Sequence, residues 1–161
     1  ALKVDPNLEQ ALSAVAADGH KVARYREPLT AAETLLKSKP DDAQALRIRY
    51  NAALGIGDEE LLADALVGLA AVEPVVARDS LLHLAFNAYD ANDLARAKVL
   101  FGQVLEVDPR QAQSHYLMAL INVNEGAKDE AKVHLERYLE LAPNEPEADT
   151  ARELLGFLRT A

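Results

Sequence analysis

The apolar residues between positions 81 and 107 form two helical stripes separated by a polar turn. The first stripe has the i, i+3, i+4, i+7 spacing of one face of an α-helix and consists of Leu81, Leu84, Ala85 and Ala88. The second stripe contains Leu94, Ala97, Leu100, Phe101, Val104 and Leu105. Between them, residues 90–93 interrupt the pattern, and Asp93 is placed to cap the second helix by accepting backbone N–H groups. The pattern predicts a helix–turn–helix that ends before Pro109, because the residue preceding a proline is disfavoured in the α conformation.

Prolines recur at a near-constant interval and indicate that this helix pair is repeated. Pro6, Pro40, Pro74, Pro109 and Pro143 are separated by 34, 34, 35 and 34 residues. A largely apolar column 28 residues before the four later prolines contains Leu12, Leu46, Leu81 and His115. A mostly small column 24 residues before them contains Ala16, Tyr50, Ala85 and Ala119. A third column, 17 residues before them and interpreted as turn or close-approach positions, contains Ala23, Gly57, Asn92 and Gly126.

The periodicity divides the chain into about four units, which must stack because one helix pair cannot bury its apolar face. The units cover residues 9–42, 43–77, 78–111 and 112–144, followed by a capping helix over 145–160, and together they are interpreted as one domain, 1–161. Residues 2–6 resemble residues 105–109, so we interpret residues 1–8 as the tail of a preceding repeat. In the first unit, Pro28 falls inside the second helix, and we expect that helix to restart near Glu27 with Pro28 in its first turn.

Composition supports an all-α fold and excludes several kinds of functional site. The 161 residues include 30 Ala and 26 Leu, both strong helix formers, and the formal net charge of −9 disfavours a nucleic-acid partner. The absence of cysteine excludes thiolate metal sites and a cysteine nucleophile, and no apolar stretch is long enough to insert into a membrane. The histidines lack the spacing of a helical metal site, and His115 is expected to pack in the core. No catalytic motif is present, so we predict no enzyme activity and no cofactor.

The repeat resembles the tetratricopeptide repeat family, whose helix–turn–helix units carry large, small and proline residues at fixed positions. In the third unit these positions hold Leu81, Ala85, Ala97, Phe101 and Pro109. In the fourth they hold His115, Ala119, Ala131, Leu135 and Pro143. The resemblance implies a right-handed superhelical solenoid of antiparallel helix pairs. Residues 138–143 and the following helix also resemble C-terminal repeat blocks of larger, exported bacterial proteins, which favours an exported or periplasmic location while leaving the compartment open.

The resemblance also implies a concave, partner-binding surface formed by the first helix of each unit. The residues carried over to it are Arg47, Asn51, Asp79, Leu82, Phe86, Tyr89, Gln113, Tyr116, Leu120 and Asn124. The aromatic members suit peptide capture, although packing within the stack is the alternative for each ring. Arg47 and Asn51 resemble half of a carboxylate clamp, but the expected Lys and Arg are replaced by Gln113 and Leu117. We therefore do not expect a clamp.

The sequence favours a non-catalytic scaffold that binds a peptide or partner protein on its concave surface. The alternative is a structural module that self-associates within a larger exported protein. The motivation for the alternative is the N-terminal edge, where a preceding repeat is expected.

Overall fold

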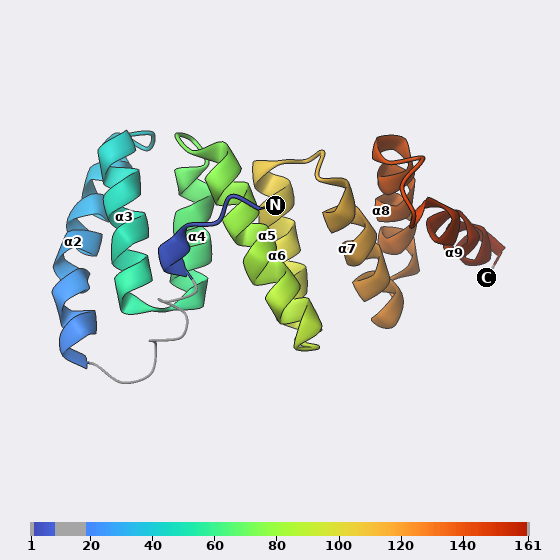
Figure 1. Cartoon of the computed structure of the whole chain (residues 1–161), viewed down its shortest axis with the longest axis horizontal. Helices are drawn as coiled ribbons and strands as arrows, with labels where there is room; N and C mark the ends of the chain where they lie inside the picture. Colours follow the sequence, from blue (N-terminus) through green and yellow to red (C-terminus); the bar gives the residue numbers. More distant parts are fainter. Residues whose placement is uncertain (1, 9–18, 161) are drawn as a thin grey trace. The chain divides into compact units, whose positions relative to one another are not determined.

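The computed structural model describes residues 2–8 and 19–160, and every regular element in this part of the chain is an α-helix (Figure 1). The helices are α2 (Gly19–Ser38), α3 (Ala43–Ile56), α4 (Glu59–Leu69), α5 (Pro74–Asp90), α6 (Leu94–Val107), α7 (Ala112–Asn124), α8 (Lys128–Leu141) and α9 (Ala148–Thr160). The all-α, helical-repeat prediction is confirmed. Residues 6–8 are also helical, whereas residues 2–5 are not.

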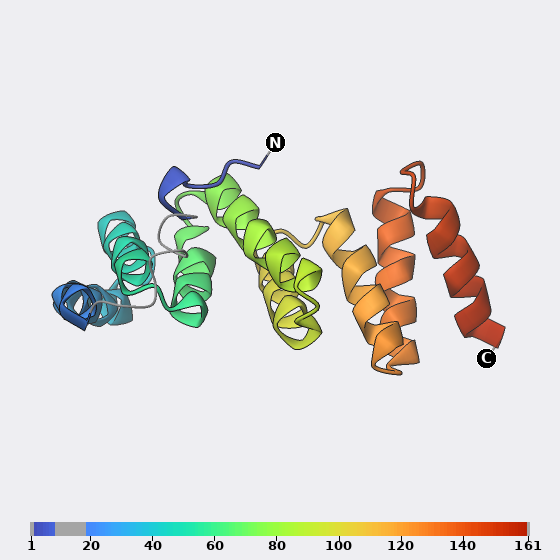
Figure 2. The same ribbon diagram turned by 60° about the horizontal axis from the view of Figure 1, so that its bottom comes forward.

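The chain forms two compact units, residues 1–83 and 84–161, and their boundary falls within α5. In the N-terminal unit, α2 packs on α3 and α3 packs on α4. In the C-terminal unit, α6 packs on α7, α7 on α8 and α8 on α9. Figure 2, turned from Figure 1, also shows α7, α8 and α9 side by side.

Short aspartates begin three of the helices, as the sequence predicts for Asp93. In each case a backbone N–H group of the first turn donates a hydrogen bond to the aspartate. The acceptors are Asp42 Oδ1 at 2.8 Å, Asp58 Oδ1 at 3.0 Å and Asp93 Oδ1 at 3.2 Å. These bonds satisfy donors that have no partner within the helix. Acids in the first turn of α4, Glu59 and Glu60, lie at the positive end of the helix dipole.

Three of the four predicted turn positions have a left-handed backbone. The φ angles are 77° at Gly57, 60° at Asn92 and 78° at Gly126. Glycine adopts this region without a Cβ clash, and asparagine tolerates it better than most residues. The fourth position, Ala23, was expected to be a turn or close-approach position but lies within α2, so a turn there is wrong.

The predicted helix restart near Glu27 is also wrong, because α2 is continuous and contains Pro28. A proline cannot donate to the carbonyl four residues earlier, here that of Arg24. Both residues are exposed, so water can hydrate the released carbonyl.

Close packing of α2 against α3 depends on a glycine. Gly55 of α3 provides space for α2, since the Tyr25 ring lies where a Cβ at position 55 would be.

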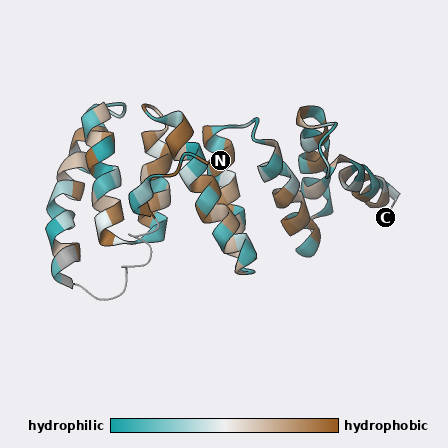
Figure 3. Ribbon diagram, in the orientation of Figure 1, coloured by the Kyte–Doolittle hydropathy of each residue, from teal (hydrophilic) through white to brown (hydrophobic). Residues whose placement is uncertain are grey.

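The apolar faces of the helices form the core of each unit. In the N-terminal unit the buried members include Leu46, Ala53, Leu62, Leu66 and Leu69. In the C-terminal unit the core between α7, α8 and α9 contains Ala119, Ala131, Leu135, Tyr138, Ala148, Ala151, Leu155 and Leu158. Figure 3 shows hydrophobic and hydrophilic residues alternating around the helices, as expected when only one face of each helix is buried.

Candidate functional site

The ten residues predicted to form a concave surface are distributed between the two units. Four belong to the N-terminal unit: Arg47, Asn51, Asp79 and Leu82. Six belong to the C-terminal unit: Phe86, Tyr89, Gln113, Tyr116, Leu120 and Asn124. Each group is therefore considered within its own unit.

In the N-terminal unit, most of the predicted side chains already have partners within the chain. Asp79 is 4% exposed, and its carboxylate accepts hydrogen bonds from Lys3 N and Arg78 Nε, both at 2.9 Å. Leu82 is buried. Arg47 Nε lies 3.7 Å from Glu73 Oε1, whereas Asn51 is exposed. Asp79 and Leu82 thus hold the fold together and do not present a free surface.

The C-terminal unit contains two groups of aromatic rings in contact, one around Phe101 and one formed by Tyr116 and Tyr138. The rings of Phe86 and Tyr89 meet that of Phe101 edge-on, with centroids 5.7 and 6.5 Å apart. The rings of Tyr116 and Tyr138 are tilted by 42°, with centroids 5.1 Å apart. Phe101 and Tyr138 are buried, while Phe86, Tyr89 and Tyr116 are half-buried. We call these three half-buried residues the aromatic strip.

The electrostatic surroundings of Tyr116 include the carboxylate of Glu147 and the phenol of Tyr89. Burial raises the pKa of Tyr116, and the proximity of Glu147 and then of Tyr89 adds to the increase. Negative charge near a phenol disfavours its ionised form, so the phenol stays neutral at physiological pH. The Tyr116 side chain is therefore a neutral ring with an apolar face and a polar hydroxyl.

The remaining predicted residues of this unit lie on α7. Gln113 and Asn124 are exposed, and Leu120 is half-buried. Gln113 is one helical turn from Tyr116, so both reach the same side of α7.

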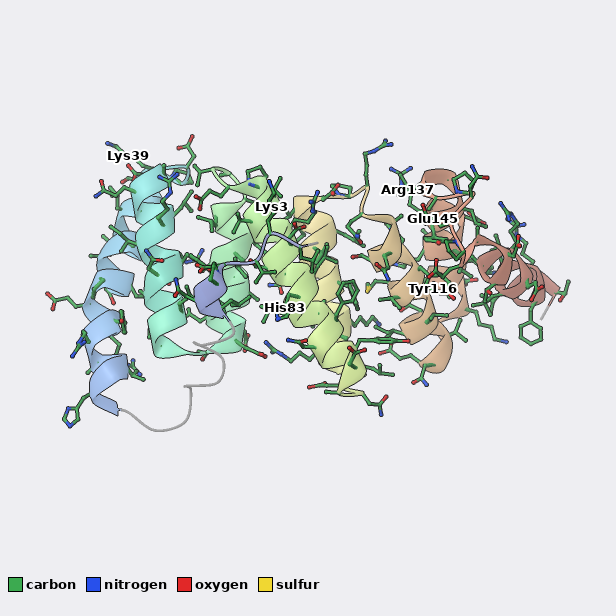
Figure 4. All side chains as sticks on the ribbon, in the orientation of Figure 1. Lys3, Lys39, His83, Tyr116, Arg137 and Glu145 are labelled. Atoms are coloured by element: carbon green, nitrogen blue, oxygen red, sulfur yellow. The ribbon has the colours of Figure 1, made fainter. Side chains whose placement is uncertain are left out.

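A cleft of about 440 Å³ opens beside Tyr116, between α7, α8 and the segment that leads into α9. It is lined by Gln111, Ala112, Gln113, Tyr116, Tyr138, Leu141, Ala142, Glu145, Pro146 and Glu147. Figure 4 marks Tyr116 and Glu145 in this region. The Tyr138 hydroxyl donates to Glu147 Oε2 at 3.5 Å, and burial, followed by Glu147 and Glu145, raises the pKa of Tyr138.

Sequence reasoning selected Gln113 and Tyr116 but missed Tyr138, Glu145 and Glu147. The missed residues come from the second helix of the unit and from the loop after Pro143, outside the first-helix positions that the family resemblance implies. The sequence did contain a signal for them. Two acids, Glu145 and Glu147, flank Pro146 shortly after the end of the predicted helix that carries Tyr138.

A second feature that the sequence spacing did not indicate is a pair of histidines. His115 Nδ1 and His134 Nδ1 are 3.0 Å apart, and His115 Nε2 lies 2.9 Å from the Pro109 carbonyl oxygen. Because that carbonyl only accepts, His115 Nε2 carries the proton, and His134 Nδ1–H donates to His115 Nδ1. His115 is thus half-buried and hydrogen-bonded in the apolar column where the sequence predicted packing.

The environment of His134 favours its neutral imidazole. Burial lowers the pKa of His134, and His115 and Lys98 lower it further. Among residues 2–8 and 19–160, no three side chains of the metal-ligating types lie close enough together to hold an ion.

The same described residues include no helix with both the length and the apolar character needed to cross a bilayer. A comparison with curated proteins found no match. The sequence profile of the family described as Tetratricopeptide repeat matches residues 88–155, which run from the end of α5 into α9. Such repeats generally mediate protein–protein interaction and are typically non-catalytic scaffolds. Residues 88–155 of this chain thus belong to the tetratricopeptide repeat family.

Proposed function

We propose that this protein is a non-catalytic interaction module and that the aromatic strip of its C-terminal unit captures a peptide segment of a partner protein. The observation that carries the proposal is the group of half-buried rings, Phe86 and Tyr89 on α5 and Tyr116 on α7, in a chain whose residues 88–155 match a family that generally mediates protein–protein interaction. Large aromatic side chains with a fixed orientation lose little entropy on binding and often dominate interface energetics. We also propose that new helix–turn–helix repeats begin near residues 43, 78 and 112.

The proposal is tested by selecting peptide ligands from a displayed library and measuring their affinity for defined variants. Tyr89→Ala and Tyr116→Ala are each expected to weaken binding at least tenfold, a loss of about 1.4 kcal/mol or more. Val133→Ala is the matched control, because Val133 is 63% exposed on α8 and outside the strip. Circular dichroism verifies that each variant keeps its helices. If both tyrosine variants bind selected peptides as tightly as the unaltered chain, the strip is not the binding surface.

Self-association is a second candidate function, supported by a different observation. Val99, Val133 and Phe157 are 63%, 63% and 67% exposed on the C-terminal unit, so their apolar side chains are available for contact with a second copy of the chain. Light scattering over a range of concentrations measures this directly. A mass that rises with concentration and falls back in Phe157→Ser supports self-association, and a constant monomer mass counts against it.

A further inference from the structure

The cleft beside Tyr116 is open to solvent and has aromatic and acidic walls. Its volume of about 440 Å³ lies within the range typical of ligand sites, about 300–1,000 Å³. Helix α7 contributes Gln113 and Tyr116, helix α8 contributes Tyr138, and the loop before α9 contributes Glu145 and Glu147. Three separate chain segments therefore converge on one space.

The aromatic walls are suited to a cation. The Tyr116 and Tyr138 rings are tilted by 42° at a centroid distance of 5.1 Å, so they form a corner and not a flat stack. The face of a tyrosine ring carries partial negative charge and attracts an ammonium or guanidinium group placed over it. Tyr138 is buried and supports Tyr116, which is half-buried and reaches the cleft.

The acidic wall is not neutralised by the chain itself. Several other carboxylates of this unit have a basic partner: Glu125 pairs with Lys98, Glu136 with Arg159, and Glu140 with Arg137. Glu145 and Glu147, by contrast, form no ion pair with any lysine or arginine among the described residues.

Arg152 is the basic residue nearest to these two glutamates in the sequence, but its guanidinium pairs with other groups. Its guanidinium donates to Asp149 Oδ1 at 2.8 Å and to the Pro143 carbonyl oxygen at 2.6 Å. Within residues 2–8 and 19–160, the hydrogen bond found to these two carboxylates is that of the Tyr138 hydroxyl, at 3.5 Å from Glu147 Oε2. Two exposed carboxylates thus face an aromatic corner without a counter-charge.

We infer that this cleft binds the charged end of an arginine or lysine side chain in a basic segment of a partner protein. The inference rests on the proposed function, to which it adds the charge of the ligand. Guanidinium and ammonium groups satisfy both walls at once, since they donate to carboxylates and stack on a tyrosine face. A bare metal ion would find only two carboxylates here, and the described residues contain no larger cluster of metal ligands.

The direct test is an NMR titration of the full ¹⁵N-labelled chain with a glycine–serine peptide that carries two arginines. A second peptide replaces each arginine by citrulline, which preserves shape and removes the charge. We expect chemical-shift changes at Tyr116, Glu145 and Glu147, and an affinity at least about tenfold higher for the arginine peptide than for the citrulline peptide. Equal affinities, changes confined to other residues, or no change at millimolar peptide would each overturn the inference.

Substitutions then separate the two walls. Glu145→Gln combined with Glu147→Gln is expected to weaken binding of the arginine peptide about tenfold. The matched control is Glu130→Gln with Glu153→Gln, which changes net charge equally at two exposed positions outside the cleft. Tyr116→Leu should weaken binding, whereas Tyr116→Phe keeps the ring and should restore it. An equal loss in the cleft and control double variants would mean that only net charge matters.

Failure of this inference can be distinguished from failure of the proposed function. Suppose that selected peptides require Tyr89 but contain no basic residue and bind the Glu145→Gln/Glu147→Gln variant unchanged. The aromatic strip then remains the binding surface, and the cationic cleft is rejected. If selected peptides ignore both tyrosines of the strip, the proposed function itself fails.

Discussion

At the scale of single residues, two polar contacts tie the segment before residue 8 to the helices of the N-terminal unit. The Tyr50 hydroxyl donates to Asp5 Oδ2 at 3.0 Å, and Lys3 N donates to Asp79 Oδ2. Burial raises the pKa of Tyr50, and the Asp5 charge adds to the increase, so the hydroxyl remains a donor across the neutral range.

Tyr50→Phe removes one of these contacts with little change of shape. We expect the free energy of unfolding to fall by about 1.5 kcal/mol, since the lost bond has a charged acceptor. Chemical denaturation measures the change. Tyr116→Phe is the control and should stay within about 0.5 kcal/mol, because the Tyr116 hydroxyl donates no hydrogen bond within the described part of the chain. Equal effects of the two variants would show that the Tyr50–Asp5 contact does not stabilise the fold.

His134 makes the stability of the C-terminal unit depend on pH. Its pKa in the folded chain is below the usual 6.5, so the unfolded chain takes up this proton at a higher pH. Stability should therefore fall as the pH decreases through about 6.5 and the unfolded state gains the proton first. His115 and Lys98 both lower the pKa of His134, and neither is a carboxylate that could stabilise the charged imidazole.

Chemical denaturation at about pH 7.5 and about pH 5.5 tests this prediction, because a histidine titrates between these values. The unaltered chain should lose more stability on acidification than the His134→Gln variant. An NMR titration of the imidazole supplies the independent readout. A His134 midpoint above 6.5, or the same pH dependence in both chains, would contradict the prediction.

At the scale of the elements, two glycines test the backbone requirements of the turns and helices separately. Gly126 has a φ of 78° between α7 and α8, whereas Gly102 lies inside α6, and an added Cβ would have no neighbour within 4 Å at either site. Gly126→Ala should cost about 1 kcal/mol because an L-residue is strained at positive φ. Gly102→Ala should gain about 0.5–1 kcal/mol because alanine loses less entropy in a helix. Thermal or chemical unfolding measures both, and the same sign for the two would refute this account.

Most of the helical elements could be predicted from local rules, and the exceptions have local causes. Some residues have effects that depend only on their immediate neighbours in the sequence. Asp93 caps a helix, and Gly57 and Gly126 allow positive φ, so spacing alone locates them. Pro28 misled the prediction because the cost of a proline within a helix depends on what surrounds the released carbonyl. Arg24 is exposed, so water can reach its carbonyl, and this is a property of the packed helix that sequence spacing does not contain.

At the scale of the whole molecule, the candidate site was only partly predictable. Phe86, Tyr89 and Tyr116 were located by the family resemblance, which implies a surface at their positions in the repeat. Asp79 was selected in the same way, yet its carboxylate accepts a hydrogen bond from the backbone N–H of Lys3. These two residues are 76 positions apart in the sequence. The cleft acids and the His115–His134 pair likewise arise from segments brought together by packing, and a repeat pattern carries no information about such meetings.

A core substitution tests whether stability is local, as stacked repeats imply. Leu135 is fully buried between α7, α8 and α9, and Leu135→Ala should cost about 2–5 kcal/mol. Because each repeat depends mainly on its neighbours, hydrogen exchange should lose protection in α7, α8 and α9 while α3 and α4 keep theirs. Val133→Ala, at an exposed position two residues away, is the control and should leave exchange unchanged. Equal loss of protection in α3 and α4 would mean that the chain unfolds as a single cooperative body, and the repeat description of its energetics would then be wrong.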